Sequence, residues 1–267
     1  MWGDDIEDMA RRRMAWLIGA LALATVALGG WFWYQSRQPA VHTVAATAPP
    51  APAANIERQI ENPIPQGPDT AALPALNDSD QVVHDSLAGV IGRAPVEQFL
   101  SPQNIVRHVV VTVDNLSQRK VAVDLRPVKP TPGQTVVSTQ GEITSLGDSN
   151  FQRYAPLVHV AQQTDVKALA VIYQRLYPLF QQAYEDLGYP GKYFNDRLVQ
   201  VIDHLLQAPE VPAPIQVVQP KVFYEYADPN LESRSAGQKL LIRMGPANAR
   251  IIKAKLRELR AEIAKNK

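Results

Sequence analysis

The feature that most constrains this chain is an uncharged run of 21 residues near its N-terminus, residues 14–34. A helix rises about 1.5 Å per residue, so a run of this length crosses the roughly 30 Å hydrocarbon core of a bilayer. Three arginines at 11–13 precede the run, and the positive-inside rule places residues 1–13 in the cytoplasm. The sequence therefore predicts a signal anchor, a single transmembrane helix over 14–34 with the rest of the chain on the outer side.

Two other interpretations of the run stay open. The apolar part of a cleaved signal peptide usually has about 7–15 residues and is closely followed by small residues. Here the run is longer and ends in four bulky aromatic residues at 31–34, which suit the headgroup layer. Alanines at 45 and 46 leave cleavage open, and a buried helix of a soluble protein is the remaining alternative.

Residues 35–76 are predicted to form a linker. They contain eight prolines in an Ala- and Thr-rich context, and apolar residues show no helical or strand periodicity there. Such a composition buries too little apolar surface to pack and behaves as a semi-extended tether. We interpret it as a spacer, with a ligand for a proline-recognition domain as the alternative.

Residues 77–267 are long enough for one hydrophobic core, and their pattern is mainly helical. The fold class predicted is therefore mainly α, a multi-helix globular domain with minor β or hairpin elements. Helices are expected from about 79 to 91, from Ser101-Pro102 to 116, over 150–161, from a cap at Thr164 or Asp165 to Gly188 with a kink at Pro178, from an Asn195 cap to about 207, from a Ser235 cap to Gly245, and from Pro246 to about 264. A short hairpin is expected over 133–146 and a strand between 214 and 226, interrupted by Pro220.

Composition narrows the classes of function. The chain has no cysteine, which excludes thiolate metal sites, iron–sulfur clusters and a cysteine nucleophile. Its net charge of +1 argues against a strongly basic nucleic-acid binder, so no nucleic-acid partner is expected. Common phosphate-binding, hydrolase and metal motifs are absent, and Ser117–Lys120, which fits S-x-x-K, falls at the end of a predicted helix. We expect no cofactor, and the sequence assigns no catalytic residue and leaves enzymatic activity open.

One candidate binding surface lies on the helix that is predicted to follow Asn195. At 100° per residue its apolar residues fill one face, and polar residues gather opposite or beside it: Asp196, Arg197, Asp203 and His204. Asp196 and Asp203 are seven residues apart, or about 10 Å along the helix axis, too far to share one metal ion directly. This face is either a solvated or inter-helix polar face or a surface for a ligand or partner.

A second candidate surface is the C-terminal helix. Between Arg234 and the C-terminus there are ten Lys or Arg residues and two Glu. Ile252, Leu256, Leu259 and Ile263 form a narrow apolar stripe, which predicts docking on the chain's own domain. A basic outer face is then expected to serve binding, with these members: Lys253, Lys255, Arg257 and Arg260. A partner helix and anionic lipid headgroups are the alternatives for this helix.

Several long segments resemble one known family. These are LPALNDSD at 73–80, VRHVVVTVDNL at 106–116, RLYPLFQQAYEDLGYP at 175–190, YFNDRLVQVIDHLLQAPEV at 193–211 and SAGQKLLIRMGPANARIIKAKLREL at 235–259. They are similar to the proteobacterial family called domain of unknown function 3014. The resemblance implies a single-pass inner-membrane protein with a periplasmic domain, and it carries over no catalytic residue.

The sequence thus leads to the hypothesis of a membrane-anchored periplasmic domain that binds or scaffolds a component of the cell envelope. Its expected partners are the lipid bilayer, through 14–34, and an unidentified envelope protein. The alternative is an envelope enzyme or ligand sensor acting on peptidoglycan or a periplasmic small molecule. A cleft that brings acidic, His or Ser side chains together from separate elements would favour the enzyme, and a closed apolar pocket would favour the sensor.

Overall fold

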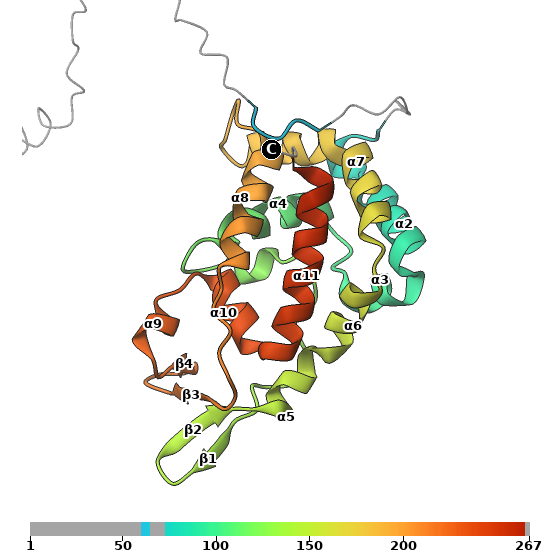
Figure 1. Cartoon of the computed structure of the whole chain (residues 1–267). Helices are drawn as coiled ribbons and strands as arrows, with labels where there is room; N and C mark the ends of the chain where they lie inside the picture. The colour runs from blue at the N-terminus through green and yellow to red at the C-terminus, as the bar shows by residue number, and fades with distance from the viewer. Residues whose placement is uncertain (1–59, 65–72, 265–267) are drawn as a thin grey trace, which may run out of the picture. The chain divides into compact units, whose positions relative to one another are not determined.

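The computed structural model describes residues 60–64 and 73–264, which all belong to one unit of the chain, residues 58–267 (Figure 1). This part is mainly helical with a small antiparallel sheet, as the sequence predicts. The predicted cytoplasmic tail, transmembrane helix and most of the predicted linker lie outside the described residues. Among the residues that are described, no helix has both the length and the apolar character needed to cross a bilayer.

Helices supply most of the ordered structure of this unit. They are α2 (Asp80–Ile91), α3 (Arg93–Phe99), α4 (Ile105–Leu116), α5 (Asp148–Phe151), α6 (Ala155–Gln163), α7 (Val166–Asp186), α8 (Phe194–Leu206), α9 (Pro229–Glu232), α10 (Ala236–Arg243) and α11 (Pro246–Ile263). Short 3-10 turns occupy Leu76–Asp78, Val123–Leu125 and Gln152–Tyr154.

Local capping signals fix several of these helix boundaries. The side chain of Asp165 accepts hydrogen bonds from two backbone amides in the first turn of α7, and Ser235 accepts one from the first turn of α10. Gly245, with φ of 88°, separates α10 from α11, and Pro246 is the first residue of α11. These predicted boundaries are confirmed, and α7 continues as one helix through Pro178.

Two predicted helix starts are wrong, because tertiary contacts replace the local signals. The helix predicted from Ser101-Pro102 begins only at Ile105, where Asp80 of α2 accepts hydrogen bonds from the amides of Asn104 and Ile105 at 2.8 Å each. Asn195 does not cap α8 either. The helix begins at Phe194, so Asn195 lies within its first turn.

The predicted hairpin is present and belongs to a larger sheet. Strands β1 (Ser138–Gln140) and β2 (Ile143–Leu146) pair antiparallel, and β3 (Ile215–Val218) and β4 (Glu225–Tyr226) extend the sheet in the order β1-β2-β3-β4. The strand predicted between 214 and 226 is therefore two strands, with Pro220 in the connection between them. One face of the sheet packs its apolar side chains on α5 and α10.

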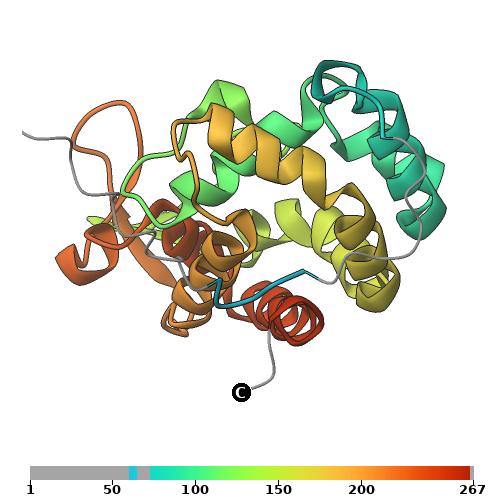
Figure 2. The same cartoon turned by 90° about the horizontal axis from the view of Figure 1, so that it is seen from above.

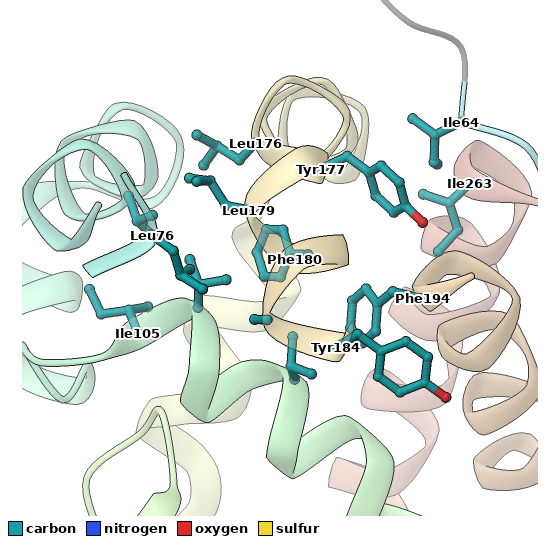
Figure 3. Packing of buried hydrophobic residues seen from close by; sticks show 14 of the residues in the cluster. Ile64, Leu76, Ile105, Leu176, Tyr177, Leu179, Phe180, Tyr184, Phe194 and Ile263 are labelled. Carbon is teal, nitrogen blue, oxygen red and sulfur yellow. The ribbon is translucent and has the colours of Figure 1, made fainter. Parts of the chain in front are cut away.

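The largest hydrophobic cluster is centred on α7. Its buried side chains meet those of α4 and α8, with α2 at one side and the end of α11 at the other (Figure 3). Aromatic rings dominate the middle, where Phe180 stacks on Phe194 with ring centroids 5.9 Å apart. This cluster sets the positions of α4, α7 and α8, the three helices that surround the candidate site.

Helix α11 docks on its own domain, as its apolar stripe predicts. It packs against α6, α7, α8 and α10. Ile252 and Leu256 contact the hydrophobic cluster beneath α8 and α10, while Leu259 and Ile263 continue into the large cluster. The stripe is therefore an internal contact, and its residues are buried or half-buried.

An additional segment packs on this domain from within the range that the sequence assigns to the linker. Residues 60–64 cross the N-terminal end of α8 next to the C-terminal end of α11 (Figures 1 and 2). Ile64 is buried in the large cluster, and Asn62 is buried beside it. We call residues 60–64 the docking segment.

Candidate functional site

A cleft of about 680 Å³ lies where the docking segment meets α4, the α7–α8 connection and α8. Its lining combines charged, amide and aromatic side chains. The residues are Ile60, Glu61, Asp114, Gln181, Tyr184, Tyr189, Gly191, Lys192, Tyr193, Asp196, Arg197 and Gln200. Three of them, at 196, 197 and 200, share one face of α8, because residues three and four apart in a helix are neighbours, and Tyr193 directly precedes the helix.

Arg197 forms the floor of the cleft together with the last turn of α4. Its Nε donates to Oδ1 of Asp114 at 2.8 Å, and its Nη2 donates at 2.8 Å both to the carbonyl oxygen of Asp114 and to Oγ of Ser117. Its Nη1 donates to Oε1 of Gln200 at 2.7 Å. All three guanidinium nitrogens are thereby engaged, which fixes the orientation of the side chain.

Two tyrosines complete this side of the cleft. The hydroxyl of Tyr189 donates to Oδ2 of Asp114 at 3.0 Å, and this hydrogen bond, together with the charge of the carboxylate, raises the pKa of the Tyr189 phenol. The rings of Tyr184 and Tyr189 stack with centroids 4.6 Å apart. Burial raises the pKa of Tyr184, so both phenols stay protonated at neutral pH. Nζ of Lys192 lies 5.0 Å from the centroid of the Tyr189 ring.

Asp196 holds the opposite wall, which is the docking segment. Its Oδ1 accepts from the backbone amide of Asn62 at 2.7 Å and from Nδ2 of the same residue at 3.1 Å. Its Oδ2 accepts from the amide of Glu61 at 3.2 Å. The carboxylate lies in the first turn of α8, where the helix dipole also favours negative charge.

The other predicted site residues of α8 join helices to one another rather than line the cleft. Asp203 forms a two-point contact with Arg260 of α11, with Nε–Oδ1 at 2.5 Å and Nη2–Oδ2 at 3.0 Å. Nε2 of His204 lies 2.8 Å from Oγ of Ser235. Ser235 is buried and already caps α10, which identifies this Ser–His contact as an inter-helix contact.

The predicted basic face of α11 is not one exposed surface. Lys253 is only 5% exposed, and its ammonium donates to the carbonyl oxygen of Ala208. Lys255 donates to the carbonyl oxygen of Thr164 and to Glu258, while Arg260 is paired as described. Arg257 is the exposed member of the predicted set. Lys253, Lys255 and Arg260 thus serve three different contacts, and the predicted set does not form one surface.

The cleft brings carboxylates together from separate elements, but their oxygens already accept hydrogen bonds from the protein. Asp114 is satisfied by Arg197 and Tyr189, and Asp196 by the docking segment. Among residues 60–64 and 73–264, no group of three or more His, Asp or Glu side chains is placed to hold a metal ion. The arrangement is that of a rigid polar surface, with Glu61, Lys192 and Gln200 exposed on it.

Asp196 and Arg197 of the predicted surface line the cleft, whereas the sequence does not predict their partners. Asp114 and Tyr189 join the site through contacts across 83 and 75 residues of sequence, and no local pattern marks such pairs. Glu61 lies in a proline-rich stretch without periodicity. Lys192 stands directly before the polar cluster that begins at Tyr193, so proximity in sequence was the one available signal.

Comparison with known proteins identifies a family but no relative of known activity. A family model described as "Protein of unknown function (DUF3014)" matches residues 105–260, more than half of the chain. The match includes four of the five segments that carry the resemblance, as well as Asp114, Arg197 and the α7–α8 connection. No match was found among curated proteins or solved structures.

Proposed function

The chain belongs to the DUF3014 family, and we propose that it is a tethered binding module of the bacterial cell envelope. In this proposal residues 14–34 anchor it in the inner membrane, residues 1–13 are cytoplasmic, and the helical domain is periplasmic. The uncharged 21-residue run and the three arginines before it support this topology. The cleft is the surface through which the domain binds an envelope protein.

The observation that carries the binding role is the rigid Arg197–Asp114 floor beneath exposed polar groups. Preorganised side chains lose little conformational entropy when a partner binds, so a fixed polar surface favours specific association. Lys192 and Glu61 offer opposite charges at its rim, which suits a partner surface that carries both signs. The carboxylates of Asp114 and Asp196 already accept hydrogen bonds from Arg197, Tyr189 and the docking segment. Because these contacts position parts of the protein, they favour a binding role over acid–base catalysis.

A protein partner fits the aromatic residues better than a sugar does. Sugar-stacking sites need an open ring face, whereas the Tyr189 ring already stacks on Tyr184 and lies under the Lys192 ammonium. The second candidate is a small-molecule sensor, because the volume of about 680 Å³ lies in the range of roughly 300–1,000 Å³ that small-ligand sites occupy. The charged lining of the cleft differs from the closed apolar pocket expected of a sensor, which makes the protein-binding role the first candidate.

Photo-crosslinking in cells tests the binding role. A photoreactive residue replacing Gln200 in the cleft should capture a defined envelope protein, while the same residue at exposed Val171 on α7, outside the cleft, should not. Lys192→Glu should weaken the capture, and Lys221→Glu, the same charge change at an exposed position outside the cleft, should leave it intact.

The outcomes separate the two candidates. Equal capture from Gln200 and Val171 contradicts a protein-binding cleft. Absence of capture, combined with a raised melting temperature of the purified chain in the presence of a peptidoglycan fragment, supports the sensor instead.

A further inference from the structure

The docking segment lies on the domain as a short peptide that bends at residues 61 and 62 and whose burial alternates from residue 61 to residue 64. Glu61 and Pro63 are exposed, whereas Asn62 and Ile64 are buried. The two buried side chains, which one exposed proline separates, both enter the domain, so they act as two anchors of one short peptide.

Side chains of α8 and its N-terminal flank bind the main chain of this peptide. Asp196 accepts from the amides of residues 61 and 62, and the hydroxyl of Tyr193 accepts from the amide of Ile64 at 2.8 Å. Nδ2 of Asn195 donates to the carbonyl oxygen of Asn62 at 2.9 Å. Pro63 has no amide hydrogen, so each amide from 61 to 64 that can donate does so. We call Tyr193, Asn195 and Asp196 the clamp.

The clamp is held in position by contacts that do not involve the peptide. Asn195 is fully buried, its Oδ1 accepts from the hydroxyl of Tyr173 at 3.1 Å, and its Nδ2 also donates to the carbonyl oxygen of Ile263 at 2.8 Å. Tyr193 packs on Tyr177 with ring centroids 5.1 Å apart. These contacts come from α7 and α11, so they would persist if the docking segment left.

Two side chains of the peptide give the clamp its selectivity. Nδ2 of Asn62 donates to Asp196, a contact that an aliphatic side chain at this position cannot make. Ile64 enters the hydrophobic cluster that contains Tyr177 and Ile263 (Figure 3). A polar or charged side chain there would lose its hydration without a partner.

We infer that the clamp is a peptide-recognition site for a short Asn-X-aliphatic segment, and that residues 60–64 occupy it as an exchangeable ligand supplied by the chain itself. Eight residues, 65–72, separate the segment from Leu73. Because the segment is covalently joined to the domain, it competes with a free peptide as an intramolecular ligand. A free peptide therefore reaches the clamp only when the internal segment is weakened or displaced. The inference is independent of what the cleft binds, although Ile60 and Glu61 also form part of its wall.

A labelled peptide of residues 58–67, RQIENPIPQG, tests the inference on the full chain. It should bind the Asn62→Ala/Ile64→Ala chain at least tenfold more tightly than the parent chain, because the internal competitor is weakened. A peptide carrying the same two replacements should not bind. Adding Asp196→Asn to the chain should abolish binding, whereas Asp203→Asn, a matched change on the same helix away from the segment, should not.

Equal binding to the parent and the weakened chain, or no binding to a weakened chain that melts cooperatively, overturns the inference. A second measurement covers the case in which the double replacement disturbs folding. The chain has no cysteine, so Ile64→Cys introduces a single thiol in a buried position. The free peptide should raise the rate at which this thiol reacts with an alkylating reagent, in a saturable manner, and a rate that does not respond to the peptide contradicts exchange.

Discussion

Arg197 of α8 and Asp114 of α4, which are 83 residues apart in the sequence, meet with 2.8 Å between guanidinium Nε and carboxylate Oδ1. Their side chains are 17% and 14% exposed, so the pair is largely shielded from water. The contact fixes the floor of the cleft and joins two helices of the large hydrophobic cluster. It therefore connects the stability of the domain to the shape of its candidate site.

Removing this arginine should destabilise the domain. In Arg197→Ala the Asp114 carboxylate stays largely buried and, among the described residues, keeps only the hydrogen bond from Tyr189. Breaking such a pair lowers the free energy of unfolding by about 3 kcal/mol, the lower end of the range for buried pairs. Arg250→Ala removes the partner of Glu210, a pair whose side chains are 64% and 55% exposed, and should cost less than about 1 kcal/mol. Urea unfolding followed by circular dichroism compares the two, and equal losses would show that the shielded pair contributes little.

The two faces of α11 should respond differently to the same charge reversal. Lys253→Glu places an unpaired carboxylate in a buried position against the carbonyl oxygen of Ala208 and should lower the free energy of unfolding by about 3 kcal/mol or more. Arg257→Glu, on the exposed side, should change it by no more than about 0.5 kcal/mol. Thermal melting of both variants measures the difference. Similar melting temperatures would mean that Lys253 is solvated.

Gly237 should tolerate no side chain, because α10 passes close to α4 and α8 there. A Cβ at this position would clash with Cδ2 of Leu205 and lie 2.8 Å from the carbonyl oxygen of Leu116. Gly237→Ala should therefore cost about 1–3 kcal/mol through overpacking. Gly89→Ala is the matched control, since nothing lies within 4 Å of its added Cβ in α2, and it should be neutral or stabilising by up to about 1 kcal/mol. A neutral Gly237→Ala would rule out this close approach.

Alkaline conditions should unfold the domain. Burial raises the pKa values of Tyr173, Tyr177 and Tyr226 above the ordinary value of 10.0. The folded chain thus retains protons that the unfolded chain releases, so stability is fully present below pH 10 and falls as the pH rises further. The phenolate absorbance of these tyrosines should appear together with the loss of helical circular dichroism. Reversible titration of every tyrosine near pH 10 in a fully helical chain would contradict the burial of these rings.

The proposed topology predicts the behaviour of a fusion reporter. Alkaline phosphatase attached after the C-terminal residue should be active, because the enzyme folds only outside the cytoplasm. A cytoplasmic reporter at the same position should be inactive, and the opposite pattern would overturn the anchor orientation. Replacing the arginines at 11–13 by glutamate should reduce phosphatase activity, since these charges set the orientation.

Features that depend on neighbouring residues could be predicted from the sequence. Asp165 and Ser235 cap helices, and the Gly245-Pro246 pair separates two of them, because each signal acts within one turn of the chain. The hairpin at 138–146 likewise depends on local alternation and a glycine turn.

Features that depend on distant partners could not be predicted. Asn195 is a good capping residue, yet Tyr173, Asn62 and Ile263 hold it inside the helix. Lys253 lies beside the apolar stripe, and its ammonium donates to the carbonyl oxygen of Ala208, which follows the C-terminal end of α8. A helical wheel of α11 does not show this distant acceptor. Asp114 became part of the site only through the packing of α4 on α8.

The docking segment also determines how far the domain can travel in the proposed topology. When residues 60–64 are bound, the chain between the predicted anchor and the domain consists of the 25 residues 35–59 and can span at most about 90 Å. When the segment is released, this connecting chain extends to residue 72 and can span at most about 140 Å. The volume that the domain can reach grows with the cube of that limit. Release of the segment from its site therefore enlarges this volume more than threefold. The local concentration of the domain near the membrane surface falls by the same factor.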